Sequence, residues 1–443
     1  MAFTDEEISQ LSKYVSNPTG NIFIVRNLPG LTGPIFARYS RAPGGFREIL
    51  LNEFIKEGVV DAQKAQDLIH RVLIAFGDES VGELEGSHIS LEDISNVATK
   101  VIEDRRIGGS PIEQSSRYVV YDQLDDQGNF RYYRDKNIMA SAHGQSFVEG
   151  MDEIFRTYIS LVEPMNAFFR KLKPIEEAEY AIKPNDKTKY RLEQLTDDRE
   201  IKDFERTYKF DIKTKACDTI RVLLPAATKT NVGIFGNGRF FNHMLTHLYS
   251  HELPEMHEHA QKAHEELNKQ IPVFVKRAKR NEYMVETERN MKELASHLTK
   301  EISLQQDLEH VILLEQKGDQ DYVDNMVAQM LFKYTNLSLP ILRIIASHLA
   351  NYRKQQVIQT YVGNRKTRFD RSGRALEYGY PLTFNLRGDF GIYRDLHRMR
   401  MLTQERQLLT TKLGFEIPQS IIDAGHEEEI NKCISISSSL WER

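Results

Sequence analysis

Hydrophobic residues near the start of the chain recur mainly at helical spacing. They predict a short helix over 5–15, with Thr4 as its N-terminal cap and acidic residues in its first turn. The same spacing predicts helices over 46–55 and 62–76. Between them, the apolar run at 22–25 ends before a Pro-Gly pair and predicts a short strand.

The centre of the chain contains a densely charged stretch at 171–209. Apolar residues recur within this stretch, so we interpret it as a folded surface insertion and not as a flexible linker. An amphipathic helix is expected over 211–224, ended by the proline that follows. Residues 226–235 are predicted to be extended, with a Gly-Asn-Gly turn at 236–238 and a new helix from about Arg239.

The last part of the chain combines a long helical region with a second mixed segment. Helical spacing dominates 254–350, and a second α/β segment begins near residue 355. Within it, 380–386 predicts a strand and 391–409 a helix. The expected fold class is α+β, an α/β domain with long helices followed by a partial second copy.

Two arginine-rich segments support this duplication. Glu85-Gly86 precedes Arg105 by about the separation at which Glu377-Tyr378 precedes Arg398. In both places a mixed polar and apolar stretch leads into the arginine turn. A boundary between 290 and 320 divides the chain into two predicted copies, 1–300 with the charged insertion and a shorter, degenerate 301–443.

Composition restricts the class of protein. The chain has 443 residues, 40% hydrophobic and 28% charged, which is ordinary for a globular protein of two or three domains. The net charge of −5 argues against a general nucleic-acid or membrane-surface binder. Cys217 and Cys433 fit no zinc or redox spacing and are expected to be free thiols in a reducing compartment. The acidic start and the lack of long apolar runs predict no signal peptide and no transmembrane helix, hence a cytoplasmic protein.

The segment 105–118 has the residue types of an anion-binding loop. Arg117, two serine hydroxyls and backbone N–H groups can together hold a phosphate. Gly108 and Gly109 allow the backbone to approach a ligand closely, and Pro111 restricts the loop. The arginines equally suit a solvated helix end, and the serines a turn into a strand, so both plainer interpretations stay open.

The order of motifs resembles that of the flavin-dependent thymidylate synthases. That family has Arg-His-Arg, seven residues and then Ser-x-Arg-Tyr, and this chain has Arg105-Arg106-Ile107, seven residues and Ser115-Ser116-Arg117-Tyr118. The family's Leu-Pro helix end, Thr-containing strand, Asn-x-Arg and Glu-Ile-Arg are matched downstream by Leu224-Pro225, Thr228-Lys229-Thr230, Asn237-Gly238-Arg239 and Glu255-Met256-His257. The resemblance covers residues 75–265.

Several positions depart from the family pattern. Arg106 and Ile107 stand where the family has a histidine and its second arginine, and Gly86 stands where it has another histidine. His257 replaces the last arginine of Glu-Ile-Arg.

The second arginine segment departs in the opposite way. Arg398-Met399-Arg400 keeps both arginines, but Leu408-Leu409-Thr410 replaces Ser-x-Arg. Sites of this family form between neighbouring subunits, so the resemblance implies a composite site. In that hypothesis Arg398 and Arg400 face the flavin, while residues 113–117 and Arg239 bind the nucleotide.

The resemblance implies reductive methylation of dUMP to dTMP, with methylenetetrahydrofolate as carbon donor and NADPH as reductant through FAD. Catalytic roles fall to Ser115 and Arg117. The implied substrate-binding residues are Glu113, Ser115, Ser116, Arg117, Arg239 and His257, and the implied cofactor-binding residues are Arg105, Arg106, Asn237, Arg398 and Arg400. The resemblance also implies a homo-oligomer, a dimer of two-copy chains, without a nucleic-acid or membrane partner.

Two other functions stay open. The lost histidines and the His257 replacement also suit a non-catalytic nucleotide- or flavin-binding homologue. Separately, His243, His247 and His251 recur at four-residue spacing, which is metal-ligand geometry on a helix. No His-Glu-x-x-His motif accompanies them and Pro254 interrupts the face, so a helical metal-binding protein is the weaker alternative and we expect no metal site.

Overall fold

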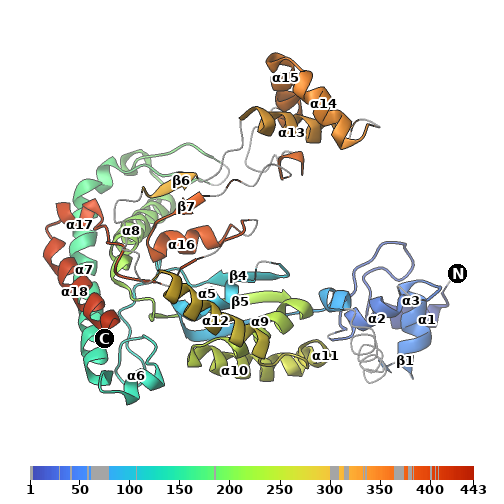
Figure 1. The fold of residues 1–443 in the computed structure, drawn as a ribbon, viewed down its shortest axis with the longest axis horizontal. Helices are drawn as coiled ribbons and strands as arrows, with labels where there is room; N and C mark the ends of the chain where they lie inside the picture. Colours follow the sequence, from blue (N-terminus) through green and yellow to red (C-terminus); the bar gives the residue numbers. More distant parts are fainter. Residues whose placement is uncertain are drawn as a thin grey trace. The chain divides into compact units, whose positions relative to one another are not determined.

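The chain, seen here in a computed structural model, forms two compact units (Figure 1). The structure describes residues 3–28, 30–39, 42–56, 59–60, 79–105, 107–183, 186–299, 309–313, 319–332, 334, 337–363, 374–377, 382, 384–399, 402–404, 406–407 and 409–443. One unit consists of 1–303 and 390–443, and the other of 304–389. None of the described helices is long and apolar enough to cross a membrane.

The N-terminal part of the first unit folds around its own apolar cluster. Its elements are α1 (Asp5–Leu11), α2 (Thr32–Tyr39), α3 (Phe46–Ile49), the π-helix η1 (Leu50–Phe54), β1 (Ile55–Lys56) and β2 (Val59–Val60). Thr4 caps α1 as predicted: its hydroxyl accepts a hydrogen bond from the Glu7 N–H, and the Glu7 carboxylate accepts one from the Thr4 N–H. The helix predicted at 46–55 is present as α3 and η1, and the helix predicted at 62–76 lies outside the described residues.

The strand predicted at 22–25 is wrong. Only Val25 forms a bridge, to Val15, while Ile22 and Ile24 are 82% and 71% exposed. A four-residue apolar run forms a strand only where a neighbouring strand and a covered face are available. Here Phe23 and Val25 pack against the core, but the run pairs only with the few residues that follow α1, so no neighbouring strand forms.

A three-stranded antiparallel sheet is the centre of the first unit. Its strands are β3 (Gly86–Ser95), β4 (Gly109–Glu113) and β5 (Lys229–Asn237), in the order β3-β5-β4. On β5, Val232 and Ile234 are buried, whereas Phe235 is 46% exposed. Alternate residues of a strand point to opposite faces, so one face of the sheet is covered and the other is open.

Helices cover the buried face of the sheet (Figure 1). They are α5 (Asn96–Glu103), α9 (Gly238–Ser250), α10 (Pro254–Gln270) and α11 (Pro272–Val275), while the 3₁₀ helix η2 (Glu79–Leu84) precedes β3 and α12 (Glu282–Thr299) contacts α9. The turn predicted at 236–238 is wrong, because β5 passes directly into α9. Asn237 caps that helix, since its side-chain oxygen accepts a hydrogen bond from the Phe240 N–H at 2.8 Å.

A second group of helices in the first unit packs around another apolar core. Its elements are α6 (Lys136–Ala140), α7 (Gly144–Leu172), α8 (Asp198–Ile220), the 3₁₀ helix η5 (Arg221–Leu223), α17 (Gln419–Asp423) and α18 (Glu427–Glu442). Phe155 and Tyr158 of α7 share this core with Ile430 and Cys433 of α18. Gly150 allows the two helices to approach, because a Cβ at that position would lie 2.8 Å from the Leu440 side chain.

The charged stretch at 171–209 contains structured elements. The 3₁₀ helices η3 (Ile175–Glu177) and η4 (Leu192–Gln194) lead into α8, and Ala178, Leu195 and Phe204 are buried together in a small core. The helix predicted at 211–224 begins earlier, at Asp198, because the Asp197 carboxylate accepts hydrogen bonds from the first backbone N–H groups of α8.

The described residues of the second unit form three α-helices, one 3₁₀ helix and a two-stranded sheet. Its elements are β6 (Val311–Leu313), α13 (Asp319–Phe332), α14 (Leu339–His348), α15 (Asn351–Val362), the 3₁₀ helix η6 (Arg374–Glu377) and β7 (Phe384–Leu386). The buried Lys354 ammonium of α15 donates to the Asp324 carboxylate of α13. The strand predicted at 380–386 is present at Phe384–Leu386, and residues 380–381 and 383 lie outside the described residues.

Residues 390–443, which the sequence assigned to a second copy, pack within the first unit. They include α16 (Phe390–His397), so the helix predicted at 391–409 is present only at its start. The origin of the chain by duplication stays a prediction.

Candidate functional site

The segment expected to form a phosphate loop is partly a strand. Residues 109–113 form β4, which pairs with β5 from Gly109 opposite Gly236 to Glu113 opposite Val232. Pro111 is tolerated because β4 is an edge strand of the sheet. The loop proper therefore begins only at Gln114, after the strand has ended.

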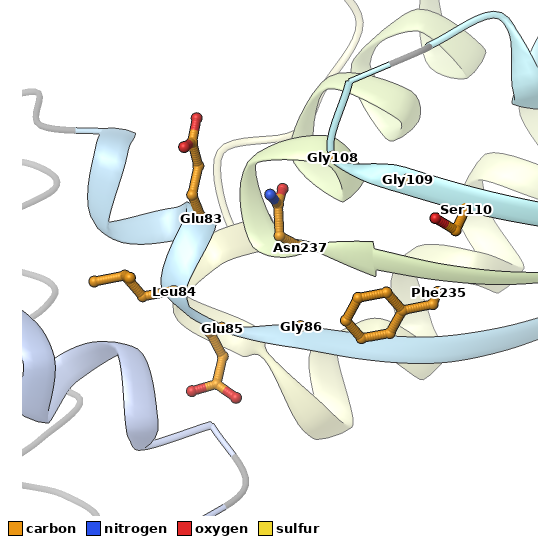
Figure 2. Close-up of a pocket in the computed structure, with 9 residues that line it drawn as sticks. All are labelled: Glu83, Leu84, Glu85, Gly86, Gly108, Gly109, Ser110, Phe235 and Asn237. Carbon is orange, nitrogen blue, oxygen red and sulfur yellow. The ribbon is translucent and has the colours of Figure 1, made fainter. Parts of the chain in front are cut away.

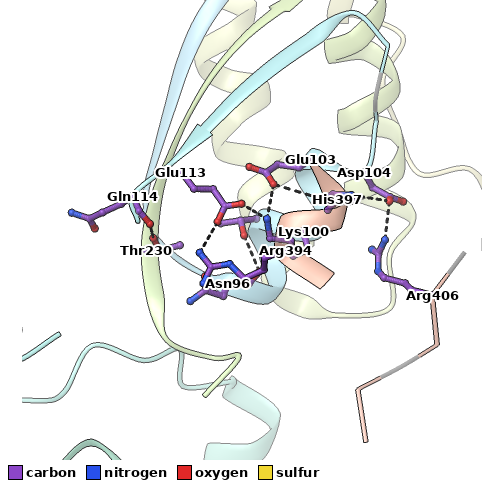
Figure 3. Close-up of polar contacts among 11 residues, drawn as sticks. Asn96, Lys100, Glu103, Asp104, Glu113, Gln114, Thr230, Arg394, His397 and Arg406 are labelled. Carbon is purple, nitrogen blue, oxygen red and sulfur yellow. Dashed lines mark hydrogen bonds and ion pairs between the residues drawn. The ribbon is translucent and has the colours of Figure 1, made fainter. Parts of the chain in front are cut away.

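A buried lysine lies at this end of β4. Lys100, on α5, is 3% exposed and donates to the carboxylates of both Glu103 and Glu113 (Figure 3). Such a buried cation requires anionic partners, and the two glutamates supply them from different elements. The network therefore ties the end of α5 to the end of β4.

The two glutamates titrate as a pair. Burial opposes ionisation, yet contacts with His397 and Lys100 lower the pKa of Glu103 to about 2. Burial and the neighbouring Glu103 carboxyl raise the pKa of Glu113. When two carboxyl groups lie close together, one loses its proton more readily and the other retains its own proton more tightly.

Helix α16 closes this network from the far end of the sequence (Figure 3). The Arg394 guanidinium donates to Glu113 at 3.0 Å and to the Ser116 hydroxyl at 3.4 Å. His397 lies 3.4 Å from an Asp104 carboxylate oxygen and 3.7 Å from one of Glu103. Helix α16, which directly precedes the second arginine segment, therefore lies against residues of and beside the first.

Electrostatics reinforce this contact. Burial alone would lower the pKa of His397, but hydrogen bonds with Asp104 and Glu103 raise it. Burial is likewise outweighed at Asp104, where His397 and the Arg406 guanidinium at 2.8 Å lower the pKa of the carboxyl. Protonated His397 is thus favoured beside two carboxylates.

Three arginines gather beside the loop that follows β4. Arg117 makes ion pairs with Asp218 at 3.1 Å and with Asp395 at 3.0 Å. Arg221, on η5, also pairs with Asp218, at 2.9 Å. Burial lowers the pKa of Arg221, and so do the charges of Arg117 and Arg394. We name Arg117, Arg221 and Arg394 the arginine cluster.

A cavity of about 470 Å³ lies at the opposite end of the sheet (Figure 2). Its lining residues are Glu83, Leu84, Glu85, Gly86, Gly108, Gly109, Ser110, Phe235 and Asn237. Backbone forms much of the wall: Gly108 has φ +87°, and a Cβ there would lie 2.9 Å from the Asn237 side chain. Glu85 is buried below the cavity, and burial raises its pKa although the Gly33 N–H donates to it.

The sequence-predicted substrate residues fall into separate places. Glu113, Ser115, Ser116 and Arg117 lie together at the arginine-cluster end of the sheet. Arg239 follows the other end of β5 and pairs with Glu83 at 2.6 Å. The four register steps between Val232 and Gly236 alone span roughly 13 Å at about 3.3 Å per residue.

His257 lies on α10, where its Nε2 is 2.6 Å from the His251 carbonyl oxygen, and α10 packs on β3. Its partner there is backbone and not a residue of the arginine cluster. Arg239, at the other end of β5, is not brought to Arg117 within one chain.

The predicted cofactor residues are divided as well. Asn237 lines the cavity, while Arg105 and Arg398 are exposed at the ends of α5 and α16. Arg106 and Arg400 lie outside the described residues.

The sequence did not predict three residues that the structure places at the candidate site, namely Lys100, Arg221 and Arg394. Lys100 lies one turn before Glu103 on α5, and this i, i+3 pair of opposite charges is the local signal that could have drawn attention to it. Arg221 directly precedes the Val-Leu-Leu-Pro helix end, so the motif itself could have drawn attention to it. Arg394 carries no local signal, because its partners lie some 280 positions away.

The histidine-rich helix does not assemble a metal site in the part of the chain that the structure describes. His247 lies on α9 and His251 directly follows its end, and burial lowers the pKa of both. His264 contacts the Tyr249 hydroxyl at 3.1 Å instead of a neighbouring histidine. These side chains have structural partners and are spread over two helices.

Comparison with known proteins gives relatives over nearly the whole chain. A UPF0159 protein of Chlamydia pneumoniae is 36% identical over 457 aligned positions, covering 99% of this chain and 81% of the relative. A UPF0159 protein of Thermoplasma acidophilum is 28% identical, covering 88% of this chain and 76% of the relative.

Two solved structures share limited similarity with the chain. A UMP/dUMP methylase PolB from Streptomyces cacaoi, bound with 5-Br dUMP, is 15% identical, covers 56% of this chain and 88% of its own, and gives a TM-score of 0.32. The flavin-dependent thymidylate synthase ThyX from Helicobacter pylori, complexed with FAD and dUMP, is 16% identical. It covers 55% of this chain and 93% of its own, with a TM-score of 0.27.

The family model described as thymidylate synthase complementing protein matches residues 36–273, which is more than half of the chain. This range contains the sheet, the buried Lys100 network and the first arginine segment. The chain belongs to the thymidylate synthase complementing protein family, the flavin-dependent thymidylate synthases whose motif order it shares.

Proposed function

We propose that the chain binds dUMP and FAD and converts dUMP to dTMP, with methylenetetrahydrofolate as carbon donor and NADPH as reductant. One observation carries this proposal: Arg117, Arg221 and Arg394 converge beside the Ser115 and Ser116 hydroxyls. Guanidinium groups and hydroxyls are the donors that a phosphate monoester requires.

The nucleotide phosphate would replace the carboxylates that now pair with Arg117. Arg117 keeps 38% of its side chain exposed, so it is accessible to a ligand. Arg394 and Arg221 are less exposed, at 15% and 20%, and would form the fixed wall of the site. In this arrangement Ser115 and Arg117 would hold the phosphate and orient the pyrimidine for reaction.

The cavity at the other end of the sheet fits part of a flavin nucleotide. Gly86, Gly108 and Gly109 offer backbone at close range, Phe235 an aromatic ring and Asn237 an amide. Arg239, beside Glu83, would serve a diphosphate. The flavin would supply hydride transfer, and the chain would supply position and charge.

The thiols of the chain agree with chemistry that uses no cysteine nucleophile. Cys217 and Cys433 are buried, and burial raises the pKa of both thiols. A buried neutral thiol is a poor nucleophile. The reaction of the flavin-dependent family needs none.

A complete site would need residues from a second chain. Arg239 and the cavity lie at one end of the sheet and the arginine cluster at the other. We infer that two chains combine opposite ends of their sheets in a homo-oligomer.

The test is direct binding and turnover by the purified protein. A flavin absorption band, stabilisation by dUMP and formation of dTMP with methylenetetrahydrofolate and NADPH are expected. An Arg117→Ala variant should lose most of its dUMP affinity while retaining flavin. A colourless protein that gains no thermal stability from FAD or dUMP would contradict the proposal.

A non-catalytic binding protein is the second candidate, and Ile107 favours it. Its side chain is 87% exposed at the position where the family has an arginine. If this candidate is right, the protein will bind dUMP or FAD, but NADPH will not bleach the bound flavin.

A further inference from the structure

We propose that Asp395, carried on α16, is an internal competitor for the nucleotide phosphate at Arg117. The phosphate must displace this carboxylate, so Asp395 sets the affinity of the site for the nucleotide phosphate. The proposal rests on the proposed function, because it takes Arg117 as a phosphate ligand.

The geometry places Asp395 where a phosphate oxygen would bind. Its Oδ2 lies 3.0 Å from Arg117 Nη2, while Asp218 Oδ1 lies 3.1 Å from Arg117 Nε. The two carboxylates therefore occupy separate edges of one guanidinium group. Only one of the two edges is held by a residue of α16.

Asp395 and its neighbour Arg394 are placed very differently. Arg394 is 15% exposed and bonds to Glu113, which is 3% exposed, so this contact is inside the protein. Asp395 is 54% exposed and Arg117 is 38% exposed, so their pair faces solvent. One helix thus contributes a fixed cation and an exchangeable anion to the same site.

The exposed pair is weak enough to be exchanged. Ion pairs in contact with water are screened, and each typically changes an equilibrium by about two- to fivefold. A phosphate monoester carries roughly −1.5 to −2 charge at neutral pH and three strong acceptor oxygens, so it binds an arginine cluster more strongly than one carboxylate does.

The docked helix also retains an unsatisfied polar group. The Tyr393 hydroxyl is buried without a hydrogen-bond partner among the described residues, although Arg406 lies 5.3 Å from the centre of its ring. A buried hydroxyl without a partner weakens the docked state. This cost offsets part of the stabilisation that the buried Arg394 contact gives to the docked helix.

The competition acts only on ligands that carry a phosphate. A nucleoside without a phosphate cannot replace the Asp395 carboxylate, whereas a nucleoside monophosphate can. The site would therefore respond to the charge of the ligand and not only to its base.

The experiment measures dUMP and deoxyuridine binding to the full-length protein by calorimetry, for wild type, Asp395→Asn and Arg117→Ala. Asp395→Asn should tighten dUMP binding about two- to fivefold and leave deoxyuridine binding unchanged. Asp203→Asn, which removes an exposed carboxylate on α8 paired with Arg206, controls for net charge and should have no effect. Asp395→Glu keeps the charge and should bind dUMP like wild type.

The outcomes separate this proposal from the function on which it rests. If Arg117→Ala weakens dUMP binding but Asp395→Asn leaves it unchanged or weaker, the competitor is wrong and the phosphate site stands. If Asp395→Asn tightens deoxyuridine as much as dUMP, the effect does not act through the phosphate and the proposal is wrong. If Arg117→Ala has no effect on dUMP, the proposed phosphate site fails first. Should Asp395→Asn unfold, the Asp395→Glu result decides, because weakened dUMP binding there would contradict competition by charge alone.

Discussion

At the scale of single residues, the buried lysine of α5 controls the candidate site. Lys100 holds Glu103 and Glu113 together, and through Glu113 it positions Arg394. Removing one member of a buried charge group leaves the others without compensation. The site is thus sensitive to a residue that need not touch the ligand.

Replacing this lysine should be strongly destabilising. Lys100→Met leaves two neighbouring carboxyl groups buried without their shared cation, so we expect the free energy of unfolding to fall by about 3–5 kcal/mol. Urea denaturation measures this change. Lys269→Met, which removes a lysine that is 68% exposed, is the control and should change the unfolding free energy by less than about 1 kcal/mol. Similar losses in both variants would contradict the assigned role.

His397 makes the contact of α16 dependent on pH. Its pKa is raised in the folded protein, so the stabilisation is fully present below about pH 6.5, the usual value in an unfolded chain. The stabilisation is lost as the pH rises through the raised pKa. Urea midpoints between pH 5.5 and about 9 should therefore fall more steeply for wild type than for His397→Gln. Parallel curves would show that His397 is not protonated in the folded state.

At the scale of elements, the sheet depends on close approach between strands and α9. Gly236 of β5 lies against Phe240, where a Cβ would be 2.5 Å from the ring, whereas a Cβ on Gly233 would meet only Ile112, at 3.5 Å. The two glycines share one strand but differ in the face that they present.

This difference gives a matched pair of variants. Gly236→Ala should destabilise the first unit by about 1–3 kcal/mol, because the ring of Phe240 cannot move freely in a closely packed core. Gly233→Ala should be neutral or slightly stabilising, since its methyl group meets ordinary contact distances. Thermal unfolding of both variants measures the effect, and equal melting temperatures would contradict it.

Elements with strong local signals were predictable from the sequence. Thr4 and the acidic first turn placed the start of α1, amphipathic spacing found the second half of α8, and helical spacing from Pro254 placed α10. The start of α9 was predicted to within one residue, although the turn expected before it is absent. β4 was not predictable, because its Gly-Ser-Pro composition disfavours a strand until β5 pairs with it. Arg394 and Glu113 meet across the whole length of the chain, so no local pattern contains their contact.

At the scale of the whole molecule, the second unit has its own stabilising centre. Lys354 and Asp324 join α15 to α13, and Lys354 is 2% exposed. The motif order that identified the family lies entirely in the first unit. Binding and the stability of the second unit should therefore respond to different substitutions.

Lys354→Met tests this independence. The loss of the buried cation should lower the unfolding free energy of the second unit by roughly 3 kcal/mol or more, and with it the melting temperature of that unit. Calorimetry should then show a separate, earlier transition, while dUMP affinity stays at the wild-type value. A single transition that shifts as a whole would show that the two units unfold together.

The packing of α18 on α7 also sets the order in which this protein can form. The two helices share one core, but the ribosome makes roughly 250 residues between them, at about 5–20 residues per second. For roughly ten to fifty seconds the side of α7 that packs on α18 is therefore uncovered. During that interval apolar surface of the nascent chain is exposed, and such surface is prone to aggregation until its partner helix is made.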